Sequence, residues 1–171
     1  FERFDDKRIL LIGAGDMGME TLRYLIDAGA KSIRIVNRNQ ERAADLAKQF
    51  KAEVRPWDQL DECLAESDLV VSTTSASQPI MTLERFKAIR SKHGSRAVLI
   101  LDLAVPRDFE RTIADLSDVY LYSVDDLQQV CDRNIQARQQ EWPKAEQIVD
   151  GEIRKFLSES VYRSSAPTIK K

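Results

Sequence analysis

The sequence is poor in the residues that build disulfide frameworks and metal centres. Its 171 residues include two cysteines and one histidine. Cys63 and Cys131 have no metal-type spacing and are too few for a disulfide framework. His93 has no acid or cysteine at helical spacing, so we assign it no chemical role. We therefore expect no metal site and two ordinary thiols.

Long hydrophobic runs and a strong charge imbalance are also lacking. No apolar run approaches the roughly 18 to 20 residues that cross a bilayer, and no signal-peptide pattern opens the chain. A net charge of −2 gives no global attraction to nucleic acid or to an anionic membrane. The composition, 43% hydrophobic and 32% charged, indicates a cytoplasmic globular protein with no membrane partner.

The length allows one well-buried domain and an appendage. The chain opens on Phe1, a few residues before the first predicted strand. We therefore expect it to be a piece of a longer protein.

A glycine-rich turn follows the first aliphatic run. Residues 9–12 are all aliphatic, which suits a strand buried on both faces, and residues 19–28 have apolar side chains at helical spacing. Gly13 permits a tight turn, Gly15 lets a pyrophosphate approach the backbone, and Gly18 lets the helix pack on the strand. We predict a dinucleotide loop at a helix N-terminus, with these cofactor-binding residues: Gly13, Ala14, Gly15, Asp16, Met17 and Gly18.

The end of the second predicted strand indicates which dinucleotide binds. Residues 32–36 form this strand, and Asn37, Arg38 and Asn39 follow it. An NAD site places an acid here to bind the ribose 2′-hydroxyl, whereas a 2′-phosphate is repelled by a carboxylate and held by guanidinium and small polar groups. Because these three residues include no acid, we predict NADPH as the cofactor. An exposed arginine at a strand end is the alternative for Arg38.

The remaining segments alternate between strand and helix patterns. Further strands are predicted at 53–55, as a short edge strand, and at 68–72, 97–103 and 119–122, and helices at 40–50, 57–66 and 82–91. This alternation predicts an α/β, Rossmann-type, doubly wound parallel sheet of about six strands, followed by a long C-terminal helix. We expect residues 1–124 to form the NADP(H)-binding domain and residues 125–171 a helical extension.

Two more groups follow the carboxyl ends of predicted strands, where ligands bind in doubly wound sheets. Thr73 and Thr74 leave room for the cofactor and can bond its ribose and phosphate. Ala104, Val105 and Pro106 combine a small residue with a fixed backbone direction, which suits a wall beside a nicotinamide ring. We include all five in the cofactor site and predict no catalytic residue. A plain Ser/Thr loop is the alternative for the first pair.

The C-terminal part of the chain has a helical pattern of unusual length. Apolar residues recur every three to five positions across residues 127–157, whereas globular helices usually span about 8 to 20 residues. We expect this apolar stripe to need a protein partner. Pro143 is predicted to kink the helix or to start a second one. The last ten residues are predicted to form a turn or a frayed end.

Five runs of residues together resemble the glutamyl-tRNA reductase family in identity, order and spacing. They are G-A-G-D-M-G at 13–18, V-N-R-N at 36–39 with E-R-A at 41–43, S-T-T at 72–74, L-D-L-A-V-P-R-D at 101–108 and Y-L-Y-S-V-D-D-L at 120–127. The last two runs are more specific than the glycine loop, which many dehydrogenases share. Asp16 and the pair Trp142 and Pro143 depart from the family pattern.

The resemblance implies an enzyme of three parts. An N-terminal domain would bind glutamyl-tRNA and supply the cysteine that forms a glutamyl thioester. The central domain would deliver hydride from NADPH to that thioester, giving glutamate-1-semialdehyde for tetrapyrrole synthesis, and C-terminal helices would form a homodimer. This chain resembles the central domain with the start of the dimerisation helix. Neither Cys63 nor Cys131 matches the nucleophile, so the chain alone is expected to be inactive.

Two other functions remain open from the sequence. A shikimate dehydrogenase-like NADP reductase would share the second-strand signature, but it would need a lysine and an aspartate from its own N-terminal domain. A non-catalytic module that senses a dinucleotide would use the long helix as a transmission arm. That module would not be expected to contain the A-V-P-R-D run at 104–108.

Overall fold

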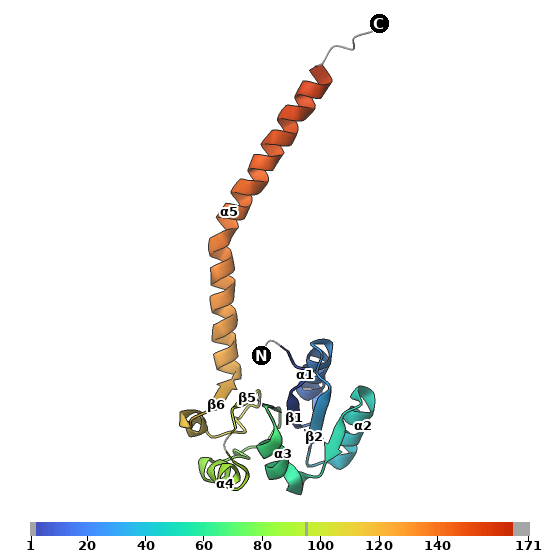
Figure 1. Cartoon of the computed structure of the whole chain (residues 1–171), viewed down its shortest axis with the longest axis vertical. Helices are drawn as coiled ribbons and strands as arrows, with labels where there is room; N and C mark the ends of the chain where they lie inside the picture. Colours follow the sequence, from blue (N-terminus) through green and yellow to red (C-terminus); the bar gives the residue numbers. More distant parts are fainter. Residues whose placement is uncertain (1–2, 95, 166–171) are drawn as a thin grey trace. The chain divides into compact units, whose positions relative to one another are not determined.

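Six parallel strands form one sheet, in the order β3-β2-β1-β4-β5-β6. Figure 1 labels β1, β2, β5 and β6 of this sheet. The structure is a computed structural model that describes residues 3–94 and 96–165. The strands are β1 (Arg8–Ile12), β2 (Ser32–Val36), β3 (Glu53–Arg55), β4 (Leu69–Ser72), β5 (Val98–Asp102) and β6 (Val119–Ser123). This confirms the predicted six-stranded doubly wound sheet, with 53–55 at one edge.

Helices connect successive strands and cover both faces of the sheet. They are α1 (Asp16–Asp27), α2 (Gln40–Phe50), α3 (Leu60–Glu66) and α4 (Leu83–His93), with short 3-10 turns at η1 (Trp57–Gln59) and η2 (Arg111–Asp115). The segment predicted as one helix over 57–66 is therefore a 3-10 turn that continues into α3. Thr82 caps α4, because its hydroxyl accepts the N–H of Arg85 at 3.3 Å.

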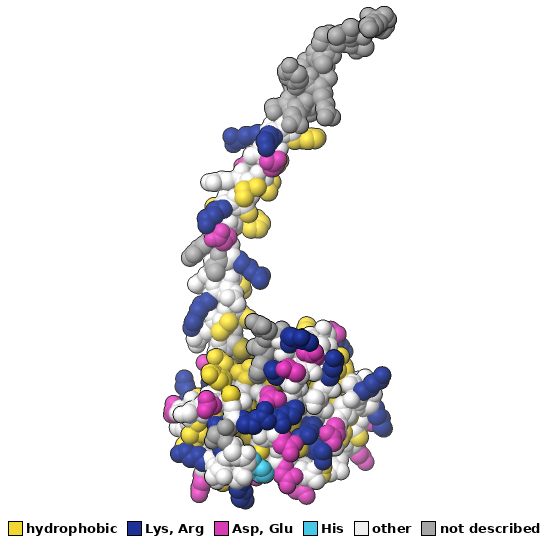
Figure 2. Space-filling model, viewed as in Figure 1, with side chains coloured by type: hydrophobic (Ala, Val, Ile, Leu, Met, Phe, Trp, Pro, Cys, Tyr) yellow, Lys and Arg dark blue, Asp and Glu magenta, His cyan; other side chains and the backbone are white. Residues whose placement is uncertain are grey.

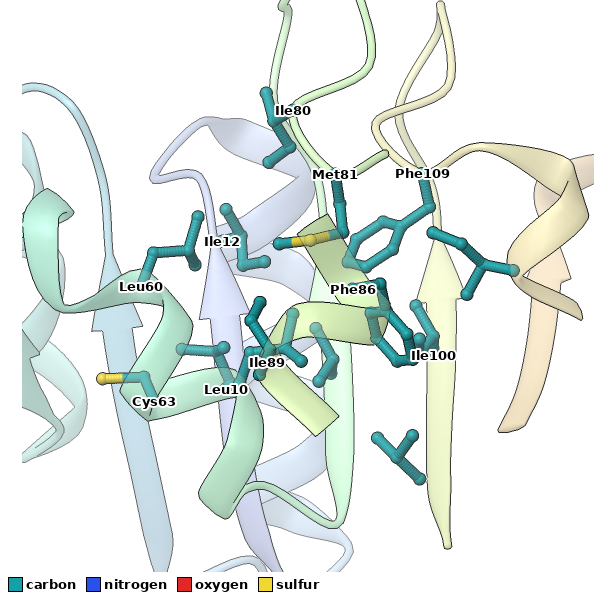
Figure 3. Packing of buried hydrophobic residues seen from close by; sticks show 14 of the residues in the cluster. Leu10, Ile12, Leu60, Cys63, Ile80, Met81, Phe86, Ile89, Ile100 and Phe109 are labelled. Carbon is teal, nitrogen blue, oxygen red and sulfur yellow. The ribbon is translucent and has the colours of Figure 1, made fainter. Parts of the chain in front are cut away.

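The aliphatic run of β1 lies at the centre of two hydrophobic clusters. Ile9 and Leu11 belong to the cluster under α1 and α2, whereas Leu10 and Ile12 belong to the cluster under α3 and α4. Side chains alternate between the faces of a strand, so both faces are buried only if every position is apolar. Figure 3 shows Leu10 beside Ile89 of α4 in the second cluster.

The strand β5 is less completely covered than its apolar sequence suggested. It lies between β4 and β6, and its residues Val98 and Ile100 are buried. Leu99 and Leu101, on the other face, are only partly buried. The cover of the sheet is therefore asymmetric at this strand.

The C-terminal helix α5 spans Val124–Ser165, 42 residues. Contacts within the chain divide it into two units, Phe1–Leu127 and Gln128–Lys171. The helix continues through Pro143, so the alternative in which a second helix starts there is wrong. Its ribbon bends near the middle (Figure 1), which agrees with the kink expected where proline removes a hydrogen bond and displaces a carbonyl.

The end of α5 differs from the predicted frayed terminus. Ser164 and Ser165 are helical, and the rest of that prediction, at 166–171, lies outside the described residues. Hydrophobic side chains are exposed along the helix (Figure 2). Among the described residues, no helix is long and apolar enough to span a membrane.

Candidate functional site

A cavity of about 310 Å³ opens at the carboxyl ends of β1, β2 and β4. Here the sheet changes direction, because the chain leaves β1 toward β2 on one side and later returns to β4 on the other. Loops that diverge at such a point leave a crevice, which is where doubly wound folds bind ligands. The lining residues are Gly13, Ala14, Gly15, Asn37, Arg38, Asn39, Arg42, Trp57, Thr73, Thr74, Ser75 and Ala76.

The glycine loop is set by the close approach of β4. The N–H of Thr73 donates to the carbonyl of Ile12 at 2.8 Å. A Cβ at Gly13 would lie 2.8 Å from Oγ1 of Thr73, and one at Gly18 would lie 3.0 Å from the same atom. Gly13 also has a φ of +104°, which disfavours other residues. These two glycines are therefore required by packing within the fold.

Gly15 differs from the other two glycines. A Cβ built there meets nothing within 4 Å, so the space beside its backbone is open to the cavity. Gly15 is the N-cap of α1 and offers no side chain to the first helical turn. The free N–H groups of that turn and the positive end of the helix dipole suit an anion. The loop thus fits a pyrophosphate group.

Two arginines lie at the β2 side of the cavity. The Arg38 guanidinium lies over the Trp57 ring, 5.1 Å from its centroid, and Arg42 lines the same cavity from the first turn of α2. Cation–π stacking restrains a guanidinium while leaving its N–H groups available. This corner combines positive charge with an aromatic surface.

The two asparagines beside Arg38 are partly committed to the backbone. Asn39 is the N-cap of α2, and its Oδ1 accepts the N–H of Arg42 at 3.1 Å. The amide of Asn37 donates to the carbonyl of Asn39 at 2.7 Å. Both residues line the cavity, but these bonds fix the turn that carries Arg38.

The β4 side of the cavity is held by the buried carboxylate of Asp108. It accepts the Ser72 hydroxyl at 2.6 Å and the N–H of Thr74 at 3.0 Å, and it also accepts the Thr74 hydroxyl. Its own carbonyl accepts the N–H groups of Ile80 and Met81. Asp108 therefore ties the loop after β5 to the loop after β4.

A second buried carboxylate, Asp102, stabilises the same turn. It accepts N–H groups from Ala104, Asp108 and Phe109 at 3.0 to 3.3 Å. Burial raises the pKa of Asp102, an effect that these backbone hydrogen bonds only partly offset. The L-D-L-A-V-P-R-D run thus contains two acids that fold the turn after β5.

Six of the predicted cofactor residues do not line the cavity. Asp16, Met17 and Gly18 lie in the first turn of α1. Ala104 is buried, Val105 is 81% exposed, and Pro106 follows it in the turn after β5. This turn adjoins the threonine loop, because the N–H of Leu103 donates to the carbonyl of Ser72 at 2.9 Å.

Four lining residues were not predicted from the sequence. Arg42 could have been found, because an N-cap at Asn39 places the third following residue in the first turn beside it. Ser75 and Ala76 simply continue the predicted Thr73 and Thr74 loop. Trp57 has no such signal, since it reaches the cavity from η1, on a different β–α connection.

The two cysteines show no feature of an activated nucleophile. Cys63 is buried in the core, and burial raises the pKa of its thiol, which is opposite to the shift that favours a reactive thiolate. Cys131 is exposed on α5. Within residues 3–94 and 96–165, no group of acids, cysteines and histidine is arranged to hold a metal ion.

The sheet order, the glycine loop at a helix N-terminus and the cavity at the switch point define a Rossmann-type dinucleotide-binding domain. The chain belongs to the shikimate / quinate 5-dehydrogenase family, whose model matches residues 1–130.

Individual relatives extend the similarity through α5. Glutamyl-tRNA reductase from Rhodopirellula baltica is 44% identical over all 171 residues, which are 40% of that protein. The enzyme of the same name from Syntrophobacter fumaroxidans is 39% identical over 99% of this chain and 37% of its own length. The chain thus spans about two fifths of these relatives. The predicted resemblance to glutamyl-tRNA reductases is confirmed.

Solved structures agree with the relatives. Glutamyl-tRNA reductase from Methanopyrus kandleri superposes with a TM-score of 0.78 at 34% identity, covering 92% of this chain and 40% of that one. The nucleotide binding domain of glutamyl-tRNA reductase from Thermoplasma volcanium shares the fold, with a TM-score of 0.61 at 21% identity, covering 78% of this chain and 86% of that one. The family name includes shikimate dehydrogenase, which is one of the alternatives raised from the sequence. The family model ends at residue 130, however, whereas the glutamyl-tRNA reductase from Rhodopirellula baltica matches all 171 residues.

The different surroundings of the glycines give a stability test. We expect Gly13→Ala to lower the free energy of unfolding by about 1 to 3 kcal/mol, because it adds a Cβ at positive φ against Thr73. Gly15→Ala, in open space at ordinary φ, should change it by less than about 1 kcal/mol. Urea unfolding of both variants measures the difference. Equal losses would show that Thr73 does not set the loop.

Proposed function

We propose that this chain is the NADPH-binding domain of a glutamyl-tRNA reductase. The observation that carries the proposal is the corner made by Arg38, Arg42 and Trp57, where the cavity lining has two cations and no acid. The similarity to glutamyl-tRNA reductases over the whole chain supports the choice of enzyme. An aromatic surface beside two guanidinium groups suits an adenine ring that carries a ribose 2′-phosphate.

The cavity would accommodate the cofactor in one orientation. The backbone of residues 13–18 would hold the pyrophosphate, at the open side of Gly15 and the N-terminus of α1. The turn of Asn37, Arg38 and Asn39 would hold the adenosine end. The nicotinamide half would then lie toward the loops after β4 and β5, along these residues: Thr73, Thr74, Ala104, Val105 and Pro106.

The chemistry divides between this domain and a part of the enzyme outside the chain. When bound, NADPH would supply a hydride to the carbonyl carbon of an enzyme-bound glutamyl thioester, giving glutamate-1-semialdehyde, the free cysteine thiolate and NADP⁺. That cysteine and the contacts to glutamyl-tRNA would belong to the N-terminal domain. The residues of this chain position the reductant, because no described side chain in the cavity is a cysteine or histidine.

Exposed apolar residues on α5 support a role for this helix in assembly. Ile135, Trp142, Val149 and Phe156 are each seven residues apart, and they are 52% to 70% exposed. Seven residues make nearly two helical turns, so these side chains follow one face. We infer that this face packs against a second copy in the longer protein and forms a homodimer.

Charge reversal at Arg38 tests the cofactor. We expect Arg38→Asp to weaken NADPH binding by about 10- to 100-fold, because a carboxylate replaces the cation beside the 2′-phosphate. NADH, which lacks that phosphate, should lose far less. Lys48→Asp, the same charge change in the last turn of α2, serves as the control. Tight NADH binding by the wild type, or unchanged NADPH binding by Arg38→Asp, would contradict the assignment.

The division of chemistry predicts a chain that binds but does not turn over. The 171 residues should quench or shift NADPH fluorescence on titration, yet they should oxidise no NADPH when glutamyl-tRNA is added. Addition of the N-terminal domain of a relative would be expected to restore turnover. Reduction by the chain alone would show that it contains the nucleophile.

The apolar face of α5 predicts the behaviour of the longer protein in solution. Val149→Glu should weaken self-association by about tenfold or more, because burying an unpaired carboxylate is costly. Gln147→Glu adds the same charge about 140° around the helix from Trp142 and should leave association unchanged. Sedimentation velocity over a concentration series separates the two variants. A longer protein that is monomeric without substitution would disprove the inference.

A further inference from the structure

The threonine wall of the cavity, Thr73 and Thr74, has its hydroxyl protons already committed. A hydroxyl carries one proton to donate and two lone pairs that accept. Oγ1 of Thr74 donates to Asp108, because a carboxylate only accepts, and Oγ1 of Thr73 donates to the carbonyl of Ile12 at 3.3 Å. Among the described residues, Oγ1 of Thr74 accepts one bond, from the N–H of Ala76, and Oγ1 of Thr73 accepts none. Each oxygen therefore keeps at least one lone pair that can accept a further hydrogen bond.

The backbone donors of this wall are committed as well. The N–H of Thr73 donates to Ile12, that of Thr74 to Asp108, and that of Ala76 to the Thr74 hydroxyl. Thr73 and Thr74 therefore face the cavity with oxygen lone pairs, and the next residue, Ser75, which also lines the cavity, is not part of this wall. This differs from the glycine loop, where the free N–H groups at the N-terminus of α1 are donors.

We propose that Asp108 is a positioning residue that turns the Thr74 hydroxyl, so that the threonine wall offers only hydrogen-bond acceptors to the dinucleotide. Ribose hydroxyls and a carboxamide NH₂ group are donors and can bind to such a wall. A phosphate group has only acceptors at neutral pH and is excluded from it. The inference rests on the proposed function, and it narrows the sequence-based expectation that these hydroxyls bond both ribose and phosphate.

Asp108 is held firmly enough to set a hydroxyl direction. It is fully buried, and its backbone N–H donates to Asp102 while its carbonyl accepts from Ile80 and Met81. Its Oδ2 is shared by Ser72 and the N–H of Thr74, which leaves Oδ1 to face the Thr74 hydroxyl. Buried groups in such a network cannot reorient without leaving a polar atom unpaired.

Asp108→Asn tests this direction with little change in shape. The amide oxygen can keep the bonds from Ser72 and the N–H of Thr74, so the NH₂ group then faces Oγ1 of Thr74 and donates to it. The Thr74 proton is released toward the cavity, and the wall gains a donor and loses an acceptor. We expect the affinity of the chain for NADPH, measured by fluorescence titration, to fall about tenfold.

A double-mutant cycle separates positioning from general damage. In a Thr74→Val background no hydroxyl remains to turn, so Asp108→Asn should change NADPH affinity by less than about twofold. Ser67→Ala is the matched control. It removes a buried hydroxyl that donates to the carbonyl of Cys63 at the other end of β4, and it should lower stability without lowering affinity.

The outcomes distinguish this inference from the proposed function. A wild-type chain that binds no NADPH would contradict the proposed function itself. If the wild type binds and Asp108→Asn binds equally well, or loses as much in the Thr74→Val background, the positioning role is wrong. Should Asp108→Asn not fold, Thr74→Ser is expected to retain affinity within about threefold and Thr74→Val to lose about tenfold. Equal affinities of those two variants would overturn the inference.

Discussion

The contact between Thr73 and the glycine loop is the constraint on which the site depends. It requires glycine at positions 13 and 18, because a Cβ at either would lie within 3.0 Å of the Thr73 hydroxyl oxygen. The loops after β1 and β4 therefore touch, and Asp108 ties the loop after β5 to them. The three loops form one packed unit, and β2 brings Arg38 to the open side. On the proposed function, a dinucleotide would lie between donors on the glycine loop and acceptors on the threonine loop.

Local sequence signals were sufficient for most of the fold. The strands, the caps and the glycine turn depend on neighbours in the chain, so residues 9–18 predicted both a strand buried on two faces and the loop that follows it. The extent of β5 cover was harder to predict. An apolar strand does not reveal how much of each face its neighbours reach, and Leu99 and Leu101 remain partly exposed.

The candidate site depends in part on contacts between distant segments, which local sequence patterns do not predict. Arg38 was found because its distance along the chain from the glycine loop is set by one β–α–β unit. Trp57 was missed because its place under Arg38 arises from packing between two separate connections. The L-D-L-A-V-P-R-D run was interpreted through its apolar residues, yet Val105 is exposed and the acids are buried. Charged residues are rarely buried without partners. The backbone N–H groups that pair with Asp102 and Asp108 can be identified only in the three-dimensional structure.

The two buried acids also explain how a site without catalytic side chains can be selective. A carboxylate inside the protein is costly unless its lone pairs accept hydrogen bonds. Asp102 and Asp108 meet this cost with N–H and hydroxyl donors, and of these donors the N–H and hydroxyl of Thr74 belong to a residue that lines the cavity. The donors that remain include those of the helix N-terminus and the two arginines, and both groups suit phosphate oxygens. Selectivity thus depends on which donors the buried acids withdraw, as much as on those that the loops present.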